Sequence, residues 1–155
     1  MQTRRRFLKD LGIAGFCMGA GLSPLEVLGN ETDRLVILHT NDTHSRIDPF
    51  DSGKFKGMGG VQARKVIVDQ IRSVEPNVLL LDAGDIFQGT PYFNLYGGEL
   101  EFKAMSAMAY DVATLGNHDF DIGIAGFMAA AAHANFEFVN ANYDFGQTAM
   151  ASRIK

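Results

Sequence analysis

Three short clusters of polar residues in this sequence combine side chains that bind metal ions or move protons. They are Asp42-Thr43-His44, Gly84-Asp85 and Gly116-Asn117-His118-Asp119-Phe120-Asp121. In an extended backbone, residues i and i+2 point to the same side, so the Asp42 carboxylate and the His44 imidazole can reach one cation. Asp85 adds a second carboxylate, and Asn117 offers a neutral oxygen. Such mixed oxygen and nitrogen ligands suit divalent metals.

The third cluster also contains a candidate for proton transfer. His118 can donate a proton or stabilise a phosphate near neutral pH, because imidazole titrates in that range. Asp121 precedes a predicted helix and fits an N-cap. For the neighbouring polar residues the sequence favours simpler roles: a solvated turn for Asp119, a strand end for Asp82 and a hydrogen-bonded strand end for His39.

Each cluster follows a short apolar run that predicts a buried strand, and helical patterns separate these runs. The predicted strands cover residues 35–38, 77–82, 111–115 and 136–140, and the predicted helices run from 59–60 to Pro76, from about 99, and over 122–134. This β-α-β-α-β-α-β order predicts an α/β fold with a parallel sheet and right-handed crossovers. The carboxyl ends of such strands share one rim, where open α/β sheets bind ligands, so the three clusters are expected to meet there.

The apolar pattern also predicts which faces are buried. The uninterrupted run 35–38 predicts a strand covered on both faces. The first helix has one apolar stripe, Ile67, Val68, Ile71 and Val74, with Arg64 and Lys65 on a solvated face. In the second helix, Phe102, Met105 and Ala109 are expected to face the core. Residues 84–98 are predicted to form a turn-rich loop, and no element is expected after the fourth strand.

The order and the flanks of the clusters make the combination specific. Asp-x-His, Gly-Asp and Gly-Asn-His-Asp, each after a predicted strand, resemble the calcineurin-like metallophosphoesterases. Further segments are similar to the 5′-nucleotidase branch, which includes UDP-sugar hydrolases and 2′,3′-cyclic-nucleotide phosphodiesterases: 38–44, Gly59-Gly60, 84–91 and 116–121. The resemblance spans residues 35 to about 145.

This resemblance implies a site with two divalent metal ions, which the sequence leaves open between Mn, Zn, Fe and Mg/Ca. Asp42 and His44 would hold the first ion, Asp85 would bridge both ions, and Asn117 would bind the second.

The implied reaction is the hydrolysis of phosphate esters, most of all nucleotides, by water activated between the two ions. His118 would stabilise the transferring phosphoryl group or protonate the leaving oxygen, held in place by Asp121. The implied partner is therefore a nucleotide or another small phosphate ester.

Complete members of this family continue with further metal ligands, a second sheet and a C-terminal domain that stacks the nucleobase. The resemblance thus implies that residues 30–155 are a truncated metallophosphatase domain, the N-terminal half of a four-layer α-β-β-α sandwich, and that this chain alone is inactive. Two alternatives stay open: a catalytically silent fragment, and a related two-Mn hydrolase that acts on sulfur-linked groups. A Rossmann-type module is disfavoured, because no Gly-x-Gly-x-x-Gly follows the first strand.

The net charge and the N-terminal residues 1–29 indicate which partners and which cellular location to expect. The chain has 14 basic and 18 acidic side chains, and the acidic surplus disfavours a nucleic acid polymer as partner. Residues 3–9 resemble the twin-arginine export pattern, and the apolar stretch 11–22 is shorter than the roughly 20 residues of a membrane span. We therefore expect residues 1–29 to be a signal peptide that engages the twin-arginine machinery, a periplasmic protein and no stable membrane anchor. Cys17, the sole cysteine, allows no disulfide.

Overall fold

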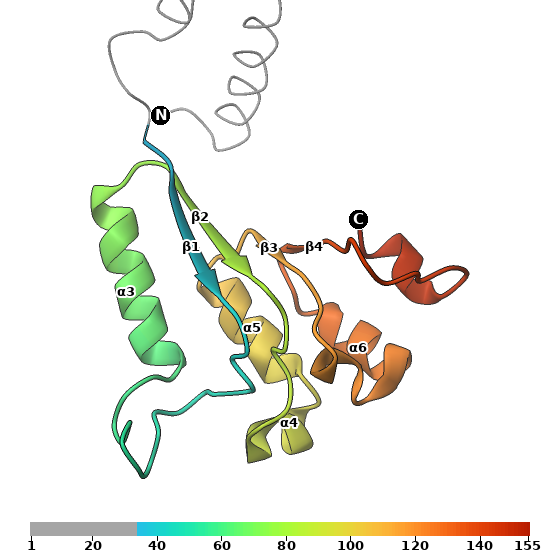
Figure 1. Cartoon of the computed structure of the whole chain (residues 1–155), viewed down its shortest axis with the longest axis horizontal. Coiled ribbons are helices and arrows are strands. Elements are labelled where there is room, and N and C mark those ends of the chain that lie inside the picture. Colours follow the sequence, from blue (N-terminus) through green and yellow to red (C-terminus); the bar gives the residue numbers. More distant parts are fainter. Residues whose placement is uncertain (1–33) are drawn as a thin grey trace, which may run out of the picture. The chain divides into compact units, whose positions relative to one another are not determined.

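The computed structural model describes residues 34–155, so the predicted signal peptide at residues 1–29 lies outside the described residues. Within them, four parallel strands form one sheet in the order β1-β2-β3-β4 (Figure 1). Their bounds are Val36–Thr40 for β1, Val78–Asp82 for β2, Val112–Ala113 for β3 and Glu137–Phe138 for β4. The predicted α/β class and parallel order are confirmed.

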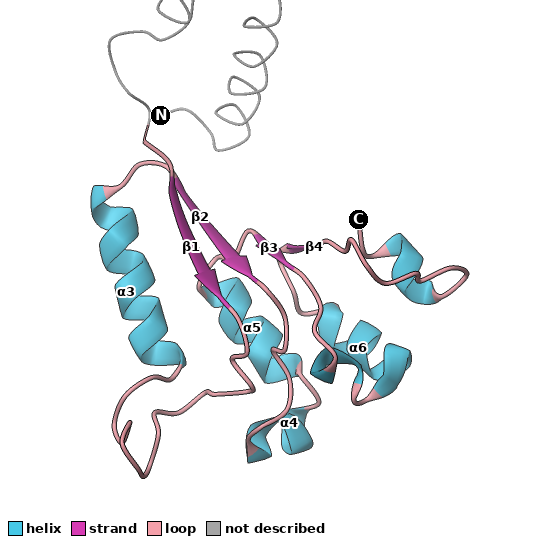
Figure 2. Cartoon of the chain, viewed as in Figure 1, coloured by secondary structure: helices cyan, strands magenta, loops and turns pink. Residues whose placement is uncertain are grey.

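Helices connect successive strands (Figure 2). They are α3 (Val61–Val74), α4 (Pro91–Tyr96), α5 (Glu99–Ala107) and α6 (Gly123–Ala131), with two 3₁₀ turns, η1 (His118–Phe120) and η2 (Ala149–Ser152). The prediction of a loop over 84–98 was wrong for its second half, where α4 begins with Pro91 in the first helical turn, a position that proline favours. The prediction that nothing follows the fourth strand was also wrong, because η2 leads to a parallel bridge between Ile154 and Phe138.

One face of the sheet holds the core. Leu80, Ala113 and Phe138, from three neighbouring strands, belong to a single buried cluster with residues of α3, α5 and α6. Right-handed crossovers that advance in one direction place every connecting helix on the same side of a sheet. Phenylalanines dominate this core: Phe87, Phe102, Phe127 and Phe138 are all 0% exposed.

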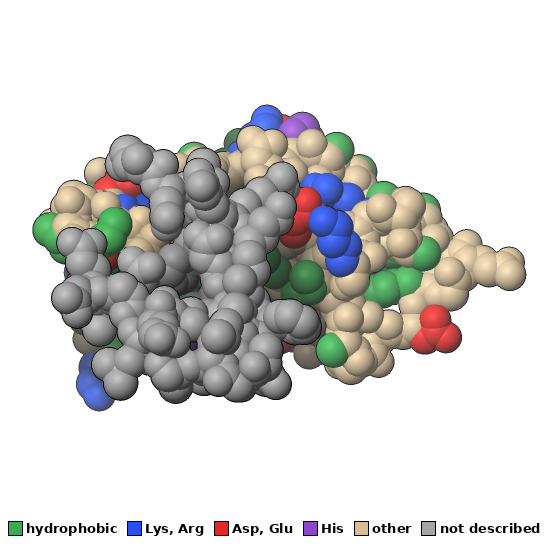
Figure 3. Space-filling model, turned by 90° about the horizontal axis from the view of Figure 1, so that it is seen from above, with side chains coloured by type: hydrophobic (Ala, Val, Ile, Leu, Met, Phe, Trp, Pro, Cys, Tyr) green, Lys and Arg blue, Asp and Glu red, His purple; other side chains and the backbone are tan. Residues whose placement is uncertain are grey.

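The opposite face of the sheet is open among the described residues. Ile37 is 56% exposed and Val139 is 39% exposed, and Leu79, Leu81 and Val112 are only partly buried. The expectation that the first strand is covered on both faces was therefore wrong for these residues. Seen from above, hydrophobic side chains also lie at the surface beside charged ones (Figure 3).

Two details of helix packing also differ from the sequence analysis. In α3, Val68 is buried but Ile67 and Val74 are exposed, while Arg64 is half-buried and donates to the Arg46 carbonyl oxygen. The aliphatic stem of an arginine can cover apolar surface while its head finds a polar partner. After α5, Ala109 is exposed in a left-handed turn with φ 56°, so it does not face the core as expected.

Among residues 34–155, no helix is both long and apolar enough to span a bilayer.

Candidate metal centre

The loops that follow β1 and β2 lie against each other and extend the pairing of these strands. Asp42 N–H donates to the Gly84 carbonyl (2.9 Å), His44 N–H to the Asp85 carbonyl (3.1 Å) and Ser45 N–H to the Ile86 carbonyl (2.8 Å). These bonds bring the first two polar clusters of the sequence together at the carboxyl rim of the sheet, as predicted.

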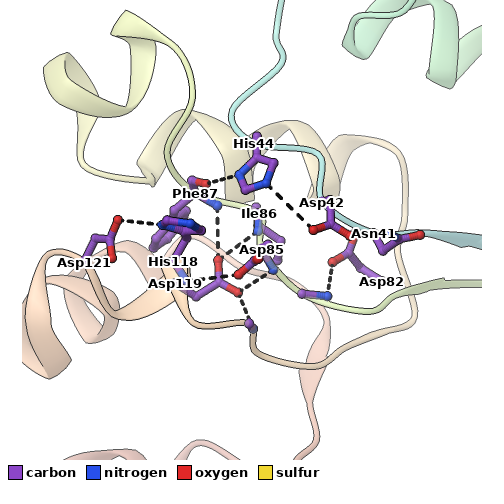
Figure 4. A network of polar contacts seen from close by, with 12 residues as sticks. Asn41, Asp42, His44, Asp82, Asp85, Ile86, Phe87, His118, Asp119 and Asp121 are labelled. Atoms are coloured by element: carbon purple, nitrogen blue, oxygen red, sulfur yellow. Dashed lines mark hydrogen bonds and ion pairs between the residues drawn. The ribbon is translucent and has the colours of Figure 1, made fainter.

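The side chains of Asp42, His44 and Asp85 converge. One ligand atom from each lies within 4.8 Å of the other two, and His44 Nε2 is 3.8 Å from Asp42 Oδ1 (Figure 4). Ligand bonds to divalent metals such as Zn²⁺ measure about 2.0–2.2 Å, so two ligands of one ion stand at most about 4 Å apart. The 3.8 Å between His44 Nε2 and Asp42 Oδ1 lies within this limit, and the 4.8 Å bound on the three atoms slightly exceeds it, so a small movement of the side chains is needed for all three to contact one ion.

A hydrogen bond fixes the orientation of His44. Its Nδ1 lies 3.2 Å from the carbonyl oxygen of Phe87. Because a carbonyl only accepts, Nδ1 donates the proton of this bond, and in the neutral imidazole the lone pair is then on Nε2, the atom next to Asp42. Metal-binding histidines usually have this second hydrogen bond, which sets the tautomer.

The backbone of this site is held in uncommon conformations. Outside glycine, six described residues have positive φ, and five of them lie in the two loops of the site: Asp42, His44, Ser45, Asp85 and Gln88. Non-glycine residues with positive φ are rare and cluster at functional sites, where surrounding contacts hold them.

The third cluster joins the first two at the turn η1. The His118 ring lies edge-on to the His44 ring, with centroids 5.4 Å apart, and His118 N–H donates to Asp85 Oδ1 (3.0 Å). His118 Nδ1 is 2.9 Å from Asp121 Oδ2, and this hydrogen bond raises the pKa of His118 and lowers the pKa of Asp121. Asn117 is exposed immediately before η1, and its role as a ligand stays a prediction.

Asp119 is the residue that the sequence analysis misjudged. It is 0% exposed rather than solvated, and its carboxylate accepts four backbone N–H bonds from the loops of the site. Burial raises the pKa of Asp119 against the lowering effect of these bonds. The spacing of Gly116 and Asp119 was one sign of this role in the sequence. A carboxylate three residues after a turn residue can accept from that residue's N–H, as in a capping box.

Two other residues near the rim have structural contacts. Asp82 is buried, as expected for a strand end, and accepts hydrogen bonds from Thr40 Oγ1 (2.5 Å) and Gly84 N–H (2.9 Å). Burial raises the pKa of Asp82 to about 6. His39 is exposed on β1 and is not among the three ligand residues that converge.

Comparison with known proteins identifies the family. Residues 35–154 match the family model of the calcineurin-like phosphoesterases. The chain belongs to this family. Within it, the chain is 47% identical to human 5′-nucleotidase over 115 residues, which are 70% of this chain and 20% of the human protein. A 5′-nucleotidase precursor from Thermus thermophilus superposes with a TM-score of 0.66 and 39% identity over 71% of this chain and 22% of the other. These likenesses place the chain in the 5′-nucleotidase branch of calcineurin-like phosphoesterases.

Two further comparisons limit what the family membership says. A sulfate thiohydrolase from Thermus thermophilus superposes with a TM-score of 0.60 at 16% identity, over 73% of this chain and 30% of the other, which shows a shared fold alone. The chain spans about a fifth of the length of the curated relatives that it matches. It corresponds to the N-terminal part of the metallophosphatase structures. In the described residues of this chain, one layer of helices packs on one sheet.

Proposed function

We propose that this chain forms the metal-binding part of an enzyme that hydrolyses nucleotide phosphate esters. The convergence of Asp42, His44 and Asp85 on one point carries the proposal. The choice of nucleotides rests on the identity to 5′-nucleotidases. The alternative of a substrate with a sulfur-linked group has only the shared fold in its favour.

Each residue of the candidate site has its own proposed role. Asp42 and His44 would hold one ion, Asp85 would be shared, and Asn117 would serve the second ion. Bound divalent ions lower the pKa of a bound water and neutralise phosphate oxygens. Because His118 Nδ1 is bonded to Asp121, Nε2 is left to donate a proton to the phosphoryl group or to the leaving oxygen.

The number of ligands limits what the chain does alone. The four proposed ligand residues, one of them shared, give each ion at most three protein ligands and the second ion only two. We therefore expect the chain by itself to bind Mn²⁺ weakly and to release phosphate from AMP well below the usual enzymatic range of about 1–10³ s⁻¹.

A chimera tests the proposed function. Residues 35–154 would replace the corresponding segment of the Thermus thermophilus 5′-nucleotidase, which shares the fold. The chimera should release phosphate from AMP only with divalent metal. His118→Asn should keep the bound metal and lower kcat by about 10²–10⁴, whereas Asp85→Asn should lower metal content and activity together.

The matched control is Asp69→Asn, which removes one carboxylate from the surface ion pair with Lys65 and should change neither quantity. A folded chimera that binds metal but does not hydrolyse AMP would overturn the proposal that this segment supports phosphate ester hydrolysis. Full metal occupancy in Asp85→Asn would overturn the assignment of the shared ligand.

Export is a separate proposal, and it rests on residues 3–22 of the sequence alone. We expect the twin-arginine machinery to deliver the protein to the periplasm. Replacing Arg4 and Arg5 by lysine in the full chain should retain it in the cytoplasm, as cell fractionation would show. Unchanged periplasmic delivery would contradict this.

A further inference from the structure

Four backbone amides surround the buried carboxylate of Asp119. Oδ1 accepts from Ile86 N–H (2.9 Å) and Phe87 N–H (3.1 Å), and Oδ2 accepts from Asp85 N–H (3.1 Å) and Gly116 N–H (2.8 Å). Figure 4 shows the carboxylate at the centre of this network. A carboxylate has about four acceptor positions. These amides therefore use them, and Asp119 has no oxygen left for a metal ion or a substrate.

The four amides belong to the loops after β2 and β3. Three of them follow β2, and the fourth follows β3. Asp85 itself is in the left-handed region with φ 54°, a conformation that needs outside support in a non-glycine residue. Phe87 supplies the carbonyl oxygen that orients His44. The Asp119 bonds thus reach the backbone of one ligand residue and of the residue that orients another.

We propose that Asp119 is a positioning residue that clamps the Asp85 and Gly116 loops together and so sets the geometry of the metal site. The inference rests on the proposed metal site for its effect on binding, whereas the clamp itself is independent of that site. Hydrogen bonds to charged groups are the strong ones, and partners behind metal ligands commonly change affinity by about 10–100-fold when they are removed.

Asp119→Asn is the sharpest variant, because asparagine has the same shape but a different pattern of donors. In either orientation, the side-chain NH₂ would face two backbone N–H groups. Two of the four bonds are lost and are replaced by donor–donor contacts, which destabilise buried groups. Asp119→Glu keeps the negative charge but places it one methylene further from the backbone. This variant therefore tests whether the position of the carboxylate matters in addition to its charge.

The experiment uses the full chain and two measurements. Calorimetry measures Mn²⁺ affinity, and amide hydrogen exchange by NMR measures protection at Asp85, Ile86, Phe87 and Gly116. We expect these four amides to exchange slowly in the unaltered chain. In both Asp119 variants they should exchange faster while sheet amides stay protected, and Mn²⁺ affinity should fall by about 10–100-fold.

Two controls make this pattern specific. Asp69→Asn removes a surface carboxylate, and Phe136→Leu disturbs the core among Phe102, Tyr110 and Phe138, away from the site. Both should leave Mn²⁺ affinity within about twofold, although Phe136→Leu lowers the melting temperature.

The outcomes are distinct. Mn²⁺ affinity within twofold of the unaltered chain in a folded Asp119→Asn overturns the proposal, as does rapid exchange of the four amides in the unaltered chain. Global unfolding of both Asp119 variants also overturns it, because Asp119 would then hold the fold and not the site. If the unaltered chain does not bind Mn²⁺, the proposed metal site fails, while selective loss of protection in Asp119→Asn still supports the clamp.

Discussion

At the scale of single residues, the candidate site contains pairs in which one member orients the other. Phe87 orients His44 through its carbonyl oxygen, and Asp121 orients His118 through its carboxylate. In each pair Nδ1 of the histidine makes the hydrogen bond, so Nε2 remains available to a metal ion or a substrate. The chemical difference lies in the acceptor: a neutral carbonyl leaves an imidazole ready to bind metal, whereas a carboxylate favours the imidazolium that donates a proton.

The His118–Asp121 pair predicts a measurable change in titration. The hydrogen bond from His118 to Asp121 raises the pKa of His118. Asp121→Asn should therefore move the midpoint of His118 titration to lower pH, with less imidazolium at neutral pH. Imidazole NMR signals followed over pH in the presence of EDTA would show this. Asp69→Asn serves as control, and an unmoved midpoint in Asp121→Asn would contradict the pairing.

Asp82 predicts a pH dependence of stability. Burial raises its pKa from 3.8 to about 6, so the folded state binds the proton more tightly than the unfolded state does. Protonation thus stabilises the fold, and this contribution is lost as pH rises from about 4 to about 6. The full difference corresponds to about 3 kcal/mol.

Asp82→Asn should remove this dependence. Asparagine can accept from Gly84 N–H and donate to Thr40 Oγ1, so the local bonds survive. Relative to the unaltered chain, the free energy of unfolding of Asp82→Asn should increase by about 2 kcal/mol between pH 4 and pH 7.5, as urea titrations with EDTA would measure. Parallel pH profiles of the two proteins would refute the shift.

At the scale of elements, the loops after β2 and β3 touch too closely for a side chain. A Cβ on Gly116 would lie 2.0 Å from Asp85 Oδ1 and 2.4 Å from Asp85 N. Gly116 has no positive φ, so the need for glycine at this position is one of space alone.

Gly116→Ala should therefore push the Asp85 loop away. We expect the variant to lose about 1–3 kcal/mol of stability and to bind Mn²⁺ at least tenfold more weakly, as calorimetry and thermal unfolding would measure. Gly53→Ala is the control for Mn²⁺ affinity: a Cβ there meets nothing within 4 Å, and the positive φ of 71° adds only local backbone strain, so stability falls while Mn²⁺ affinity should not change. Equal affinity in the two variants would show that the contact does not matter to the site.

The sequence predicted the elements that have a clear apolar period. It did not predict a very short helix or the burial of polar side chains, which depends on individual contacts. The four strands and three main helices follow from apolar runs, and the convergence of Asp42, His44 and Asp85 follows from parallel strands. α4 is too short for a periodic signal. Asp119 and Arg64 are polar, so their burial depends on partners that only the folded chain brings near.

At the scale of the whole molecule, the sheet face that is open among residues 34–155 is expected to affect behaviour in solution. Ile37 and Val139 are exposed there, beside partly buried residues of β2 and β3. Contiguous exposed apolar surface promotes association.

Ile37→Thr should reduce this association. Threonine keeps the β-branched shape that strands favour, so the melting temperature should change little while light scattering begins at a higher protein concentration. Leu95→Thr is the control, because Leu95 is 74% exposed on α4, outside the sheet. An equal gain in solubility from both variants would show that the sheet face is not the site of association.

Strand order equals chain order in this sheet, so each strand, once synthesised, finds its pairing partner already present. Folding can thus advance from the N-terminal side as the chain emerges from the ribosome. Asp42, His44 and Asp85 emerge together with β1 and β2, but the amide of Asp85 finds its acceptor only when Asp119 follows, 34 residues later. The proposed metal site is therefore expected to reach its final geometry only after β3 and η1 have left the ribosome, which would delay metal capture during synthesis until His118, the residue proposed to act on the phosphoryl group, is also in place.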